Sequence, residues 1–252
     1  MKHWTTLILS FVCWVGIAQE EALFDAATEH YNAGKYEAAA EKYLQILENG
    51  QHSAALYYNL GNCYYKLNRI APSIYFYEKA LLLDPNDPEI KSNLAYAQNM
   101  TLDVIEAIPQ SGISKIIDRV TGLLTFDQWS YTAIVLMLLF VTFYIAYYYM
   151  RYASRKRLAF VLSLGCLFLA MASVLFAYIQ HNQYLKRQPA IIFDTEVAVK
   201  SEPNTRSQDA FILHEGTKVQ VLEQLNEWKK IALADGSTGW LPQQSLKPIK
   251  DF

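Results

Sequence analysis

The organisation of the chain follows from two uncharged stretches, residues 131–149 (YTAIVLMLLFVTFYIAYYY) and residues 158–179 (LAFVLSLGCLFLAMASVLFAYI). At about 1.5 Å per residue they would span roughly 28 and 33 Å as helices, enough to cross a hydrocarbon core about 30 Å thick. Neither stretch contains Asp, Glu, Lys, Arg or His, the residues that mark ion or substrate paths inside a membrane. The sequence therefore predicts transmembrane helices over residues 130–150 and 158–179 that anchor the protein and do not conduct.

The loop between the two stretches, residues 151–157 (RYASRKR), carries four cations and no acid, whereas only Lys186 and Arg187 follow the second stretch closely. By the positive-inside rule, this loop is predicted to be cytoplasmic, which places both flanking regions outside. Tyrosine and tryptophan side chains at both ends of the first stretch fit the two membrane interfaces. The alternative is a buried core hairpin of a soluble protein, but uncharged runs of this length are typical of membrane spans.

Composition and motifs argue against nucleic-acid binding and against catalysis. The chain has 252 residues and a net charge of −2, and residues 21–110 hold twelve acidic and six basic side chains, which disfavours nucleic acid as a partner. Cys13, Cys63 and Cys166 lie in three different regions and predict neither a disulfide nor a metal site. No nucleophile-elbow, P-loop, zinc-protease or dinucleotide-binding motif occurs. We therefore predict a protein that is not an enzyme and uses no cofactor or metal.

The N-terminal residues have the pattern of a secretory signal. Lys2 and His3 precede an apolar run over residues 7–18, and Gly16 with Ala18 supplies the small residues that signal peptidase requires. This run is too short to span a bilayer, so residues 1–18 are predicted to be a signal peptide cleaved after Ala18. An uncleaved anchor is the alternative, and it gives the same topology.

A pattern with a period of 34 residues follows from Glu20. The recurring pairs are Gly34/Asn68, Tyr36/Ile70, Ala39/Ser73 and Tyr43/Tyr77. This period is typical of the tetratricopeptide repeat, and residues 57–85 (YYNLGNCYYKLNRIAPSIYFYEKALLLDP) resemble that family closely. The resemblance implies an all-α superhelix with repeats over 20–53 and 54–87 and a capping helix over 88–107. It also implies that Gly61 leaves room for large residues between the two helices of a unit.

In the tetratricopeptide family, the first helix of each unit lines a concave binding face. The family's groove positions correspond here to Phe24, Thr28, Tyr31, Tyr58, Asn62, Tyr65, Lys66, Ser92, Tyr96 and Asn99. Tyrosine and asparagine suit peptide binding, because rigid rings supply contact area and amides satisfy a peptide backbone. The acidic surroundings favour a basic or neutral peptide, and a single cation, Lys66, makes a carboxylate clamp improbable. The alternative for each tyrosine is packing between repeats.

The segment over residues 109–129 is predicted to be a linker. Pro109 and Gly112 end the last repeat helix. Apolar residues then recur at helical spacing, namely Ile113, Ile116, Ile117, Val120, Leu123 and Leu124. This spacing predicts an amphipathic helix on the outer bilayer surface, and packing against the repeats is the alternative.

From residue 180 to residue 252 the pattern changes to short alternating runs separated by turns, which predicts a small all-β barrel of about five strands. The expected strands are 196–200, 218–222, 228–233 and 239–241, with Asp235 and Gly236 in a hairpin turn. Together with Trp240, these features resemble the bacterial SH3-like domain. The resemblance implies that Trp228 lies in the core and Trp240 in the ligand cleft. The sequence departs from the family pattern beside that cleft at three positions, Ala198, Lys200 and Glu202.

The order of these modules resembles the BatE component of the aerotolerance (Bat) operon family, a multi-domain membrane protein. That resemblance implies an inner-membrane protein in envelope stress tolerance. Its expected partners are membrane-bound von Willebrand A-type proteins and, indirectly, a cytoplasmic MoxR-type ATPase. Our interpretation is an adaptor whose repeats hold an exported protein partner. The alternative is a cell-wall receptor whose SH3-like domain binds peptidoglycan.

Overall fold

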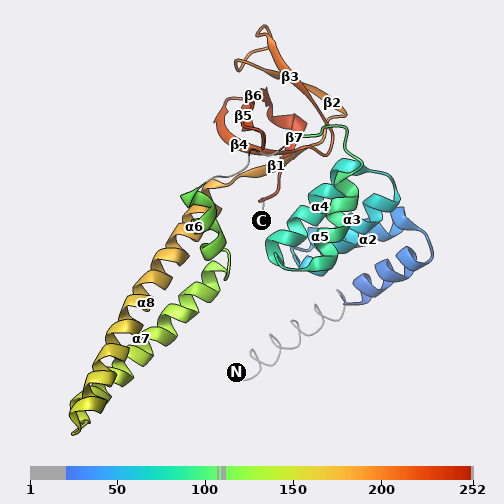
Figure 1. The fold of residues 1–252 in the computed structure, drawn as a ribbon. Coiled ribbons are helices and arrows are strands. Elements are labelled where there is room, and N and C mark those ends of the chain that lie inside the picture. Colours follow the sequence, from blue (N-terminus) through green and yellow to red (C-terminus); the bar gives the residue numbers. More distant parts are fainter. Residues whose placement is uncertain (1–20, 107, 109–111, 251–252) are drawn as a thin grey trace, which may run out of the picture. The chain divides into compact units, whose positions relative to one another are not determined.

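The structure is a computed structural model that describes residues 21–106, 108 and 112–250 (Figure 1). The chain forms two compact units, one from Met1–Ala107 with Gln188–Phe252 and the other from Ile108–Arg187. The predicted fold class is confirmed, because helical repeats, two long apolar helices and an antiparallel sheet follow one another in the expected order. The predicted signal peptide, residues 1–18, lies outside the described residues.

The repeat domain (residues 21–106) is built from paired helices. After helical residues 21–32 it comprises α2 (Tyr36–Glu48), α3 (Ala54–Lys66), α4 (Ile70–Leu83) and α5 (Pro88–Gln98). Gly34 and Asn68 both have positive φ, 75° and 56°, in the turns before α2 and α4. Their recurrence in the sequence therefore reflects a left-handed turn residue that glycine and asparagine adopt readily.

Between α3 and α4, a glycine and a tyrosine fit against each other. Tyr77 is fully buried, and a Cβ added at Gly61 would come within 2.6 Å of its ring. The buried Ser73 hydroxyl donates a hydrogen bond to the Gly61 carbonyl at 3.0 Å. Gly61 thus provides the space that the repeat resemblance implied, and serine replaces the usual alanine with its polar group satisfied.

The capping helix is shorter than predicted. The sequence predicts helix to residue 107, but α5 ends at Gln98, and residues 102–106 have no helical structure. This extended segment carries Asp103 to the C-terminal domain, where its side chain accepts hydrogen bonds from two residues. Tertiary contacts therefore override the local helical pattern in this segment.

The C-terminal part, which we call the barrel domain (residues 188–250), has seven antiparallel strands. They are β1 (Pro189–Ile192), β2 (Glu196–Lys200), β3 (Asp209–His214), β4 (Lys218–Leu225), β5 (Trp228–Ala232), β6 (Thr238–Pro242) and β7 (Leu246–Pro248), in the sheet order β3-β2-β6-β5-β4-β1-β7. Buried residues from all seven strands form one core, so the sheet curls around it.

Three expectations for this domain are corrected. Its first strand begins at Pro189, because residues 180–186 continue the preceding helix. Three strands, β1, β3 and β7, were not predicted, and two of them have only four and three residues. Trp228 is half-buried rather than part of the core, because it lies at the end of β5 paired with Leu225.

The barrel domain packs on the repeat domain within the same unit. Ile191 and Ile249 join the repeat core, and the Phe193 ring meets the Tyr75 ring edge-on at 5.5 Å between centroids. Lys218 donates to both oxygens of the Glu78 carboxylate, at 2.8 and 2.7 Å. The two domains therefore share an apolar contact and a charged pair in which Glu78 is buried and Lys218 is half exposed.

A second polar contact in this interface centres on Asp103. Its carboxylate accepts hydrogen bonds from the His214 backbone N–H at 2.7 Å and the Thr217 hydroxyl at 2.5 Å, and it lies 2.7 Å from the His214 Nδ1 atom. Burial raises the pKa of Asp103, but the hydrogen bonds from Thr217 and His214 outweigh burial and hold the pKa below its usual value. The contact therefore favours the ionised carboxylate.

The contribution of Asp103 to stability is expected to depend on pH. Since its folded-state pKa is depressed, its stabilisation is present above the unfolded pKa of about 3.9 and is lost as the pH falls through the folded value. Asp103→Asn should lower the free energy of unfolding by about 2 kcal/mol at neutral pH. The difference from wild type should shrink below about pH 4 in urea titrations. A difference that is constant down to pH 2 would contradict this assignment.

The second unit is a helical hairpin with a short helix before it. It consists of α6 (Ile113–Thr121), α7 (Phe126–Tyr149) and α8 (Ala153–Lys186). The predicted loop 151–157 is mostly helical, because α8 begins at Ala153 and only residues 150–152 lie between the two helices. Small side chains on α7 and α8 are buried where the helices meet, namely Ala133, Ala159, Ser163, Ala170 and Ser173. Small residues allow such close helix packing in a membrane.

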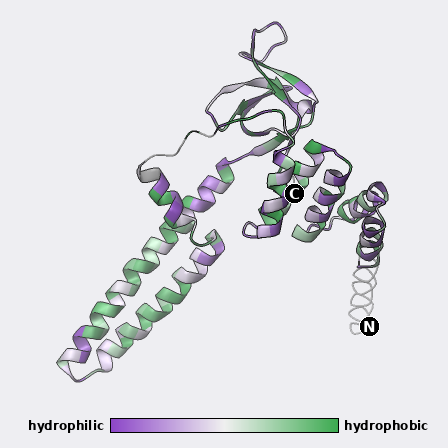
Figure 2. Cartoon of the chain, turned by 45° about the vertical axis from the view of Figure 1, so that its right-hand side comes forward, coloured by the Kyte–Doolittle hydropathy of each residue, from purple (hydrophilic) through white to green (hydrophobic). Residues whose placement is uncertain are grey.

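Both hairpin helices are long and apolar enough to cross a membrane. They would extend about 36 and 51 Å at 1.5 Å per residue. Figure 2 shows hydrophobic residues along both helices, and many of these side chains are exposed, such as Leu138 and Phe168 at 64% and 68%. An apolar surface of this extent is unusual for a soluble monomer and fits contact with lipid.

The short helix α6 contacts α8 through polar groups. The Gln183 amide donates to Asp118 at 3.3 Å, and the Gln180 amide donates to the carbonyls of Thr121 and Leu124 at 3.3 and 3.2 Å. Large apolar residues of the same region stay exposed, including Ile116 at 63%. The helix is therefore amphipathic, as the spacing of its apolar residues predicts.

Candidate functional site

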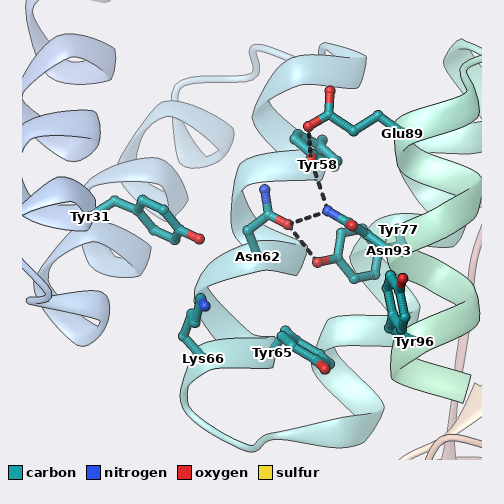
Figure 3. A pocket seen from close by; sticks show the side chains of 9 residues that line it. All are labelled: Tyr31, Tyr58, Asn62, Tyr65, Lys66, Tyr77, Glu89, Asn93 and Tyr96. Carbon is teal, nitrogen blue, oxygen red and sulfur yellow. Dashed lines mark hydrogen bonds between the residues drawn. The ribbon is translucent and has the colours of Figure 1, made fainter. Parts of the chain in front are cut away.

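A hollow of about 370 Å³ lies in the repeat domain, and we call it the repeat hollow (Figure 3). It is lined by Tyr31, Tyr58, Asn62, Tyr65, Lys66, Tyr77, Glu89, Asn93 and Tyr96. Helix α3 supplies the largest share of these side chains, and α5 supplies three more. Five of the nine are tyrosines, so rigid rings with polar tips form most of its wall.

Hydrogen bonds connect the polar side chains of the repeat hollow. The Tyr77 hydroxyl donates to the Asn62 carbonyl oxygen at 2.6 Å, and the Asn93 amide donates to the same oxygen at 3.0 Å. The Asn93 amide also donates to the Tyr58 hydroxyl at 2.8 Å, and Tyr58 donates to Glu89 at 2.6 Å. This network joins α3, α4 and α5 and fixes the orientation of both amides.

The network leaves two amide atoms available to a ligand. Within the described part of the chain, the Asn62 nitrogen and the Asn93 oxygen have no hydrogen-bond partner. One is a donor and the other an acceptor, which matches the N–H and C=O of a peptide unit. The hollow therefore offers a ligand one amide donor and one amide acceptor.

Two hydroxyls in the hollow, those of Tyr58 and Tyr77, have raised pKa values. Burial, followed by the hydrogen bond to Glu89, raises the pKa of Tyr58 to about 12. Burial, followed by the neighbouring Tyr58 and Tyr31, raises the pKa of Tyr77. Both hydroxyls can therefore serve as hydrogen-bond donors under physiological conditions.

Six of the ten predicted groove positions meet in the repeat hollow, namely Tyr31, Tyr58, Asn62, Tyr65, Lys66 and Tyr96. Phe24 and Thr28 instead pack against Tyr43, the first with its ring edge-on at 5.3 Å and the second through a 2.9 Å hydrogen bond. Ser92 and Asn99 lie on exposed positions of α5 and its end, outside the hollow. These four positions follow the repeat pattern but do not share the site.

Three lining residues were not predicted as site residues, namely Tyr77, Glu89 and Asn93. Asn93 occupies the same repeat position as Asn59, 34 residues earlier, but Asn59 does not line the hollow, so the period gave no signal for Asn93. Tyr77 was identified in the sequence only as the repeat of Tyr43, yet it lines the hollow and its hydroxyl donates to Asn62. Glu89 follows Pro88 in the first turn of α5, where an acid also suits the helix dipole and gives no distinct signal.

Trp240 lies on β6 of the barrel domain and does not line the repeat hollow. Its ring is half-buried, and the Lys230 ammonium lies 5.8 Å from the ring centroid. Gly239 beside it is required by packing, because an added Cβ would lie 2.4 Å from the Val199 side chain. Trp240 itself pairs with Lys200 of β2, and part of its ring is open to solvent.

The fold and the repeat hollow define a protein-interaction chain that combines helical repeats, an SH3-like domain and two apolar helices long enough to cross a membrane. Family comparisons agree with both modules. Residues 24–88 match the tetratricopeptide repeat, and residues 195–247 match the bacterial SH3 domain. No curated protein matches the chain.

Both matched modules are typically non-catalytic interaction domains, and no enzyme family matches. Among the residues that the structure describes, no group of three or more His, Cys, Asp or Glu side chains could hold a metal ion. Cys63 is buried in the repeat core, and burial raises the pKa of its thiol to about 12. This thiol is therefore a core residue rather than a reactive group.

Proposed function

We propose that this protein is a membrane-anchored adaptor that holds an extended segment of an exported partner protein in the repeat hollow. The observation that carries the proposal is the pair of amide atoms on Asn62 and Asn93, held by the network among α3, α4 and α5. Tyrosine rings around them supply contact area at low entropic cost. Lys66 and Glu89 balance each other in charge, which suits a neutral or weakly basic peptide.

The membrane arrangement that we propose has both domains in the periplasm and the turn at residues 150–152 in the cytoplasm of a bacterial inner membrane. The contact between the repeat and barrel domains supports their location on the same side of the membrane. Two domains in contact require an even number of crossings between them, and the two apolar helices satisfy this condition. The four cations of residues 151–157 support a cytoplasmic turn.

We further propose that the adaptor acts in a Bat-type envelope stress assembly. The module order, with tetratricopeptide repeats before a membrane hairpin and an SH3-like domain after it, supports this assignment. In such an assembly, von Willebrand A-type membrane proteins are the direct partners, and a MoxR-type ATPase is reached through them.

Asn93→Ala is expected to weaken peptide binding about tenfold, because it removes the acceptor amide and one hydrogen bond that orients Asn62. The measurement offers the full-length protein in detergent an array of peptides from the exported regions of von Willebrand A-type Bat proteins. The matched control is Asn99→Ala, which removes the same amide from the end of the same helix but outside the hollow. Equal losses in the two variants, or no retained peptide, would contradict the proposal.

A cell-wall receptor is the second candidate, and the half-exposed Trp240 ring in the bacterial SH3 domain favours it. The accessible part of such a ring can stack on a sugar or contact a short peptide. The discriminating measurement is sedimentation of the full-length protein with purified peptidoglycan. Sedimentation that disappears in Trp240→Ala but survives Asn93→Ala would favour the receptor over the adaptor.

A further inference from the structure

A second hollow lies at the turn end of the hairpin, and we call it the turn hollow. It measures about 480 Å³ and is lined by Tyr147, Ala153, Lys156, Arg157, Phe160 and Val161. The end of α7 supplies one of these residues and the first turns of α8 supply the others. The turn hollow is therefore built by the helical hairpin alone.

One side of the turn hollow is cationic. The Lys156 ammonium lies over the Tyr147 ring, 4.9 Å from its centroid, so the ring fixes the cation at the hollow. Arg157 is exposed beside it. Within the described part of the chain, no acidic side chain lies within ion-pair distance of either residue, nor of Arg151 or Arg155. The positive charge is therefore uncompensated by the protein.

The other side of the turn hollow is apolar. Phe160 and Val161 are 46% and 63% exposed, and the Phe160 ring lies 5.5 Å from the Tyr147 ring between centroids. The exposed apolar surface continues along α8 through Leu164 and Phe168. A ligand that satisfies both sides must carry an anionic group at one end and hydrocarbon at the other.

We propose that the turn hollow binds an anionic phospholipid. Lys156 and Arg157 contact the headgroup phosphate, and the acyl chains lie along Phe160, Val161 and the apolar face of α8. Basic pockets at the cytoplasmic ends of transmembrane helices recognise such headgroups, and each nearby cation contributes to their binding. The turn hollow is distinct from the repeat hollow. It would give the protein a preference for anionic phospholipid that does not depend on peptide binding.

General attraction between a basic turn and an acidic membrane is the competing explanation, and the turn itself offers a matched control. Lys156→Gln with Arg157→Gln removes two charges from the lining. Arg151→Gln with Arg155→Gln removes two charges from the same turn but leaves the lining intact. At physiological salt, screening over about 8 Å limits attraction by charges outside the hollow.

The experiment titrates the purified full-length protein, in non-ionic detergent, with phosphatidylglycerol, with phosphatidylcholine of the same chain length, or with inorganic phosphate. Binding is measured as the rise in unfolding temperature with ligand concentration. Phosphatidylglycerol is expected to give a saturable rise in wild type. The Lys156/Arg157 variant should bind at least about tenfold more weakly, and the Arg151/Arg155 variant should change less than about threefold.

Three results would overturn the proposal. Equal losses in the two double variants would indicate general attraction. A rise of the same size with inorganic phosphate would indicate a free-phosphate site that does not use the apolar wall. Equal rises with phosphatidylcholine and phosphatidylglycerol would show that the headgroup is not recognised. If the Lys156/Arg157 variant does not fold, the Arg151/Arg155 variant decides, because general attraction would weaken its binding of phosphatidylglycerol by about tenfold, whereas binding in the turn hollow requires a change below about threefold.

Discussion

Tyr77→Ala is expected to lower the free energy of unfolding of the repeat domain by about 3–5 kcal/mol, the range for truncating a buried aromatic ring. Tyr77 is 1% exposed and its ring packs against Gly61, which has no side chain to fill the space left by truncation. The substitution also removes the hydroxyl that donates to Asn62. Hydrogen exchange of the amides in α3 and α4 measures the effect, because it reports this domain separately from the hairpin.

Tyr77→Phe separates packing from positioning. It keeps the ring and removes only the 2.6 Å hydrogen bond to Asn62, so the expected loss of stability is about 1 kcal/mol. The free energy of peptide binding should fall by more than the free energy of unfolding, because the Asn62 amide loses one of the two groups that orient it. A loss below about 1 kcal/mol for Tyr77→Ala would contradict the packing described for this ring.

Lys218→Met is expected to release the barrel domain from the repeat domain, at a cost of about 3 kcal/mol. Glu78 has a side chain that is 9% exposed, and Lys218 is the cation that compensates it at 2.7 Å. Removing one member of a buried pair costs about 3–5 kcal/mol, and the lower end applies because Lys218 is half exposed. Proteolysis within residues 99–106, measured against denaturant, reports the release.

Two further variants test the cause of this effect. Glu78→Gln combined with Lys218→Met removes both charges and should recover much of the loss, because no carboxylate is left buried and unpaired. Lys230→Met breaks the pair with Glu223, in which the two side chains are 33% and 62% exposed and 3.6 Å apart, and it should cost less than about 1 kcal/mol. Equal losses of unfolding free energy in Lys218→Met and Lys230→Met would show that the pair with Glu78 stabilises the protein no more than an exposed ion pair does.

Periodicity predicted the helical parts of the fold well. The 34-residue period indicated paired helices because each repeat buries the same positions, of which Tyr43 and Tyr77 are buried examples. The uncharged stretches indicated α7 and α8, although residues 153–157, three of which are basic, were assigned to a loop. Those residues lie in the first turns of α8 because a helix can begin with polar residues outside an apolar core.

Sequence patterns were weaker for short strands and for contacts between distant segments. β7 has three residues, too few for an alternating pattern to stand out. Within the candidate site, the helical register indicated Tyr58 and Asn62, but Glu89 and Asn93 required knowledge of how α5 packs beside α3. Glu78 and Asp103 lie on surfaces that only the barrel domain covers, and their partners are 140 and 111 residues away.

The separation between Asp103 and His214 also has a consequence for biogenesis. Asp103 leaves the ribosome before the hairpin and the barrel domain are made. Its partner, His214, follows 111 positions later. At about 5–20 residues per second, synthesis of that segment lasts roughly 5–20 seconds. During this interval the Tyr75 ring and the Glu78 carboxylate lack their contacts with Phe193 and Lys218, so the nascent repeat domain is exposed to proteases and aggregation until the barrel domain is complete.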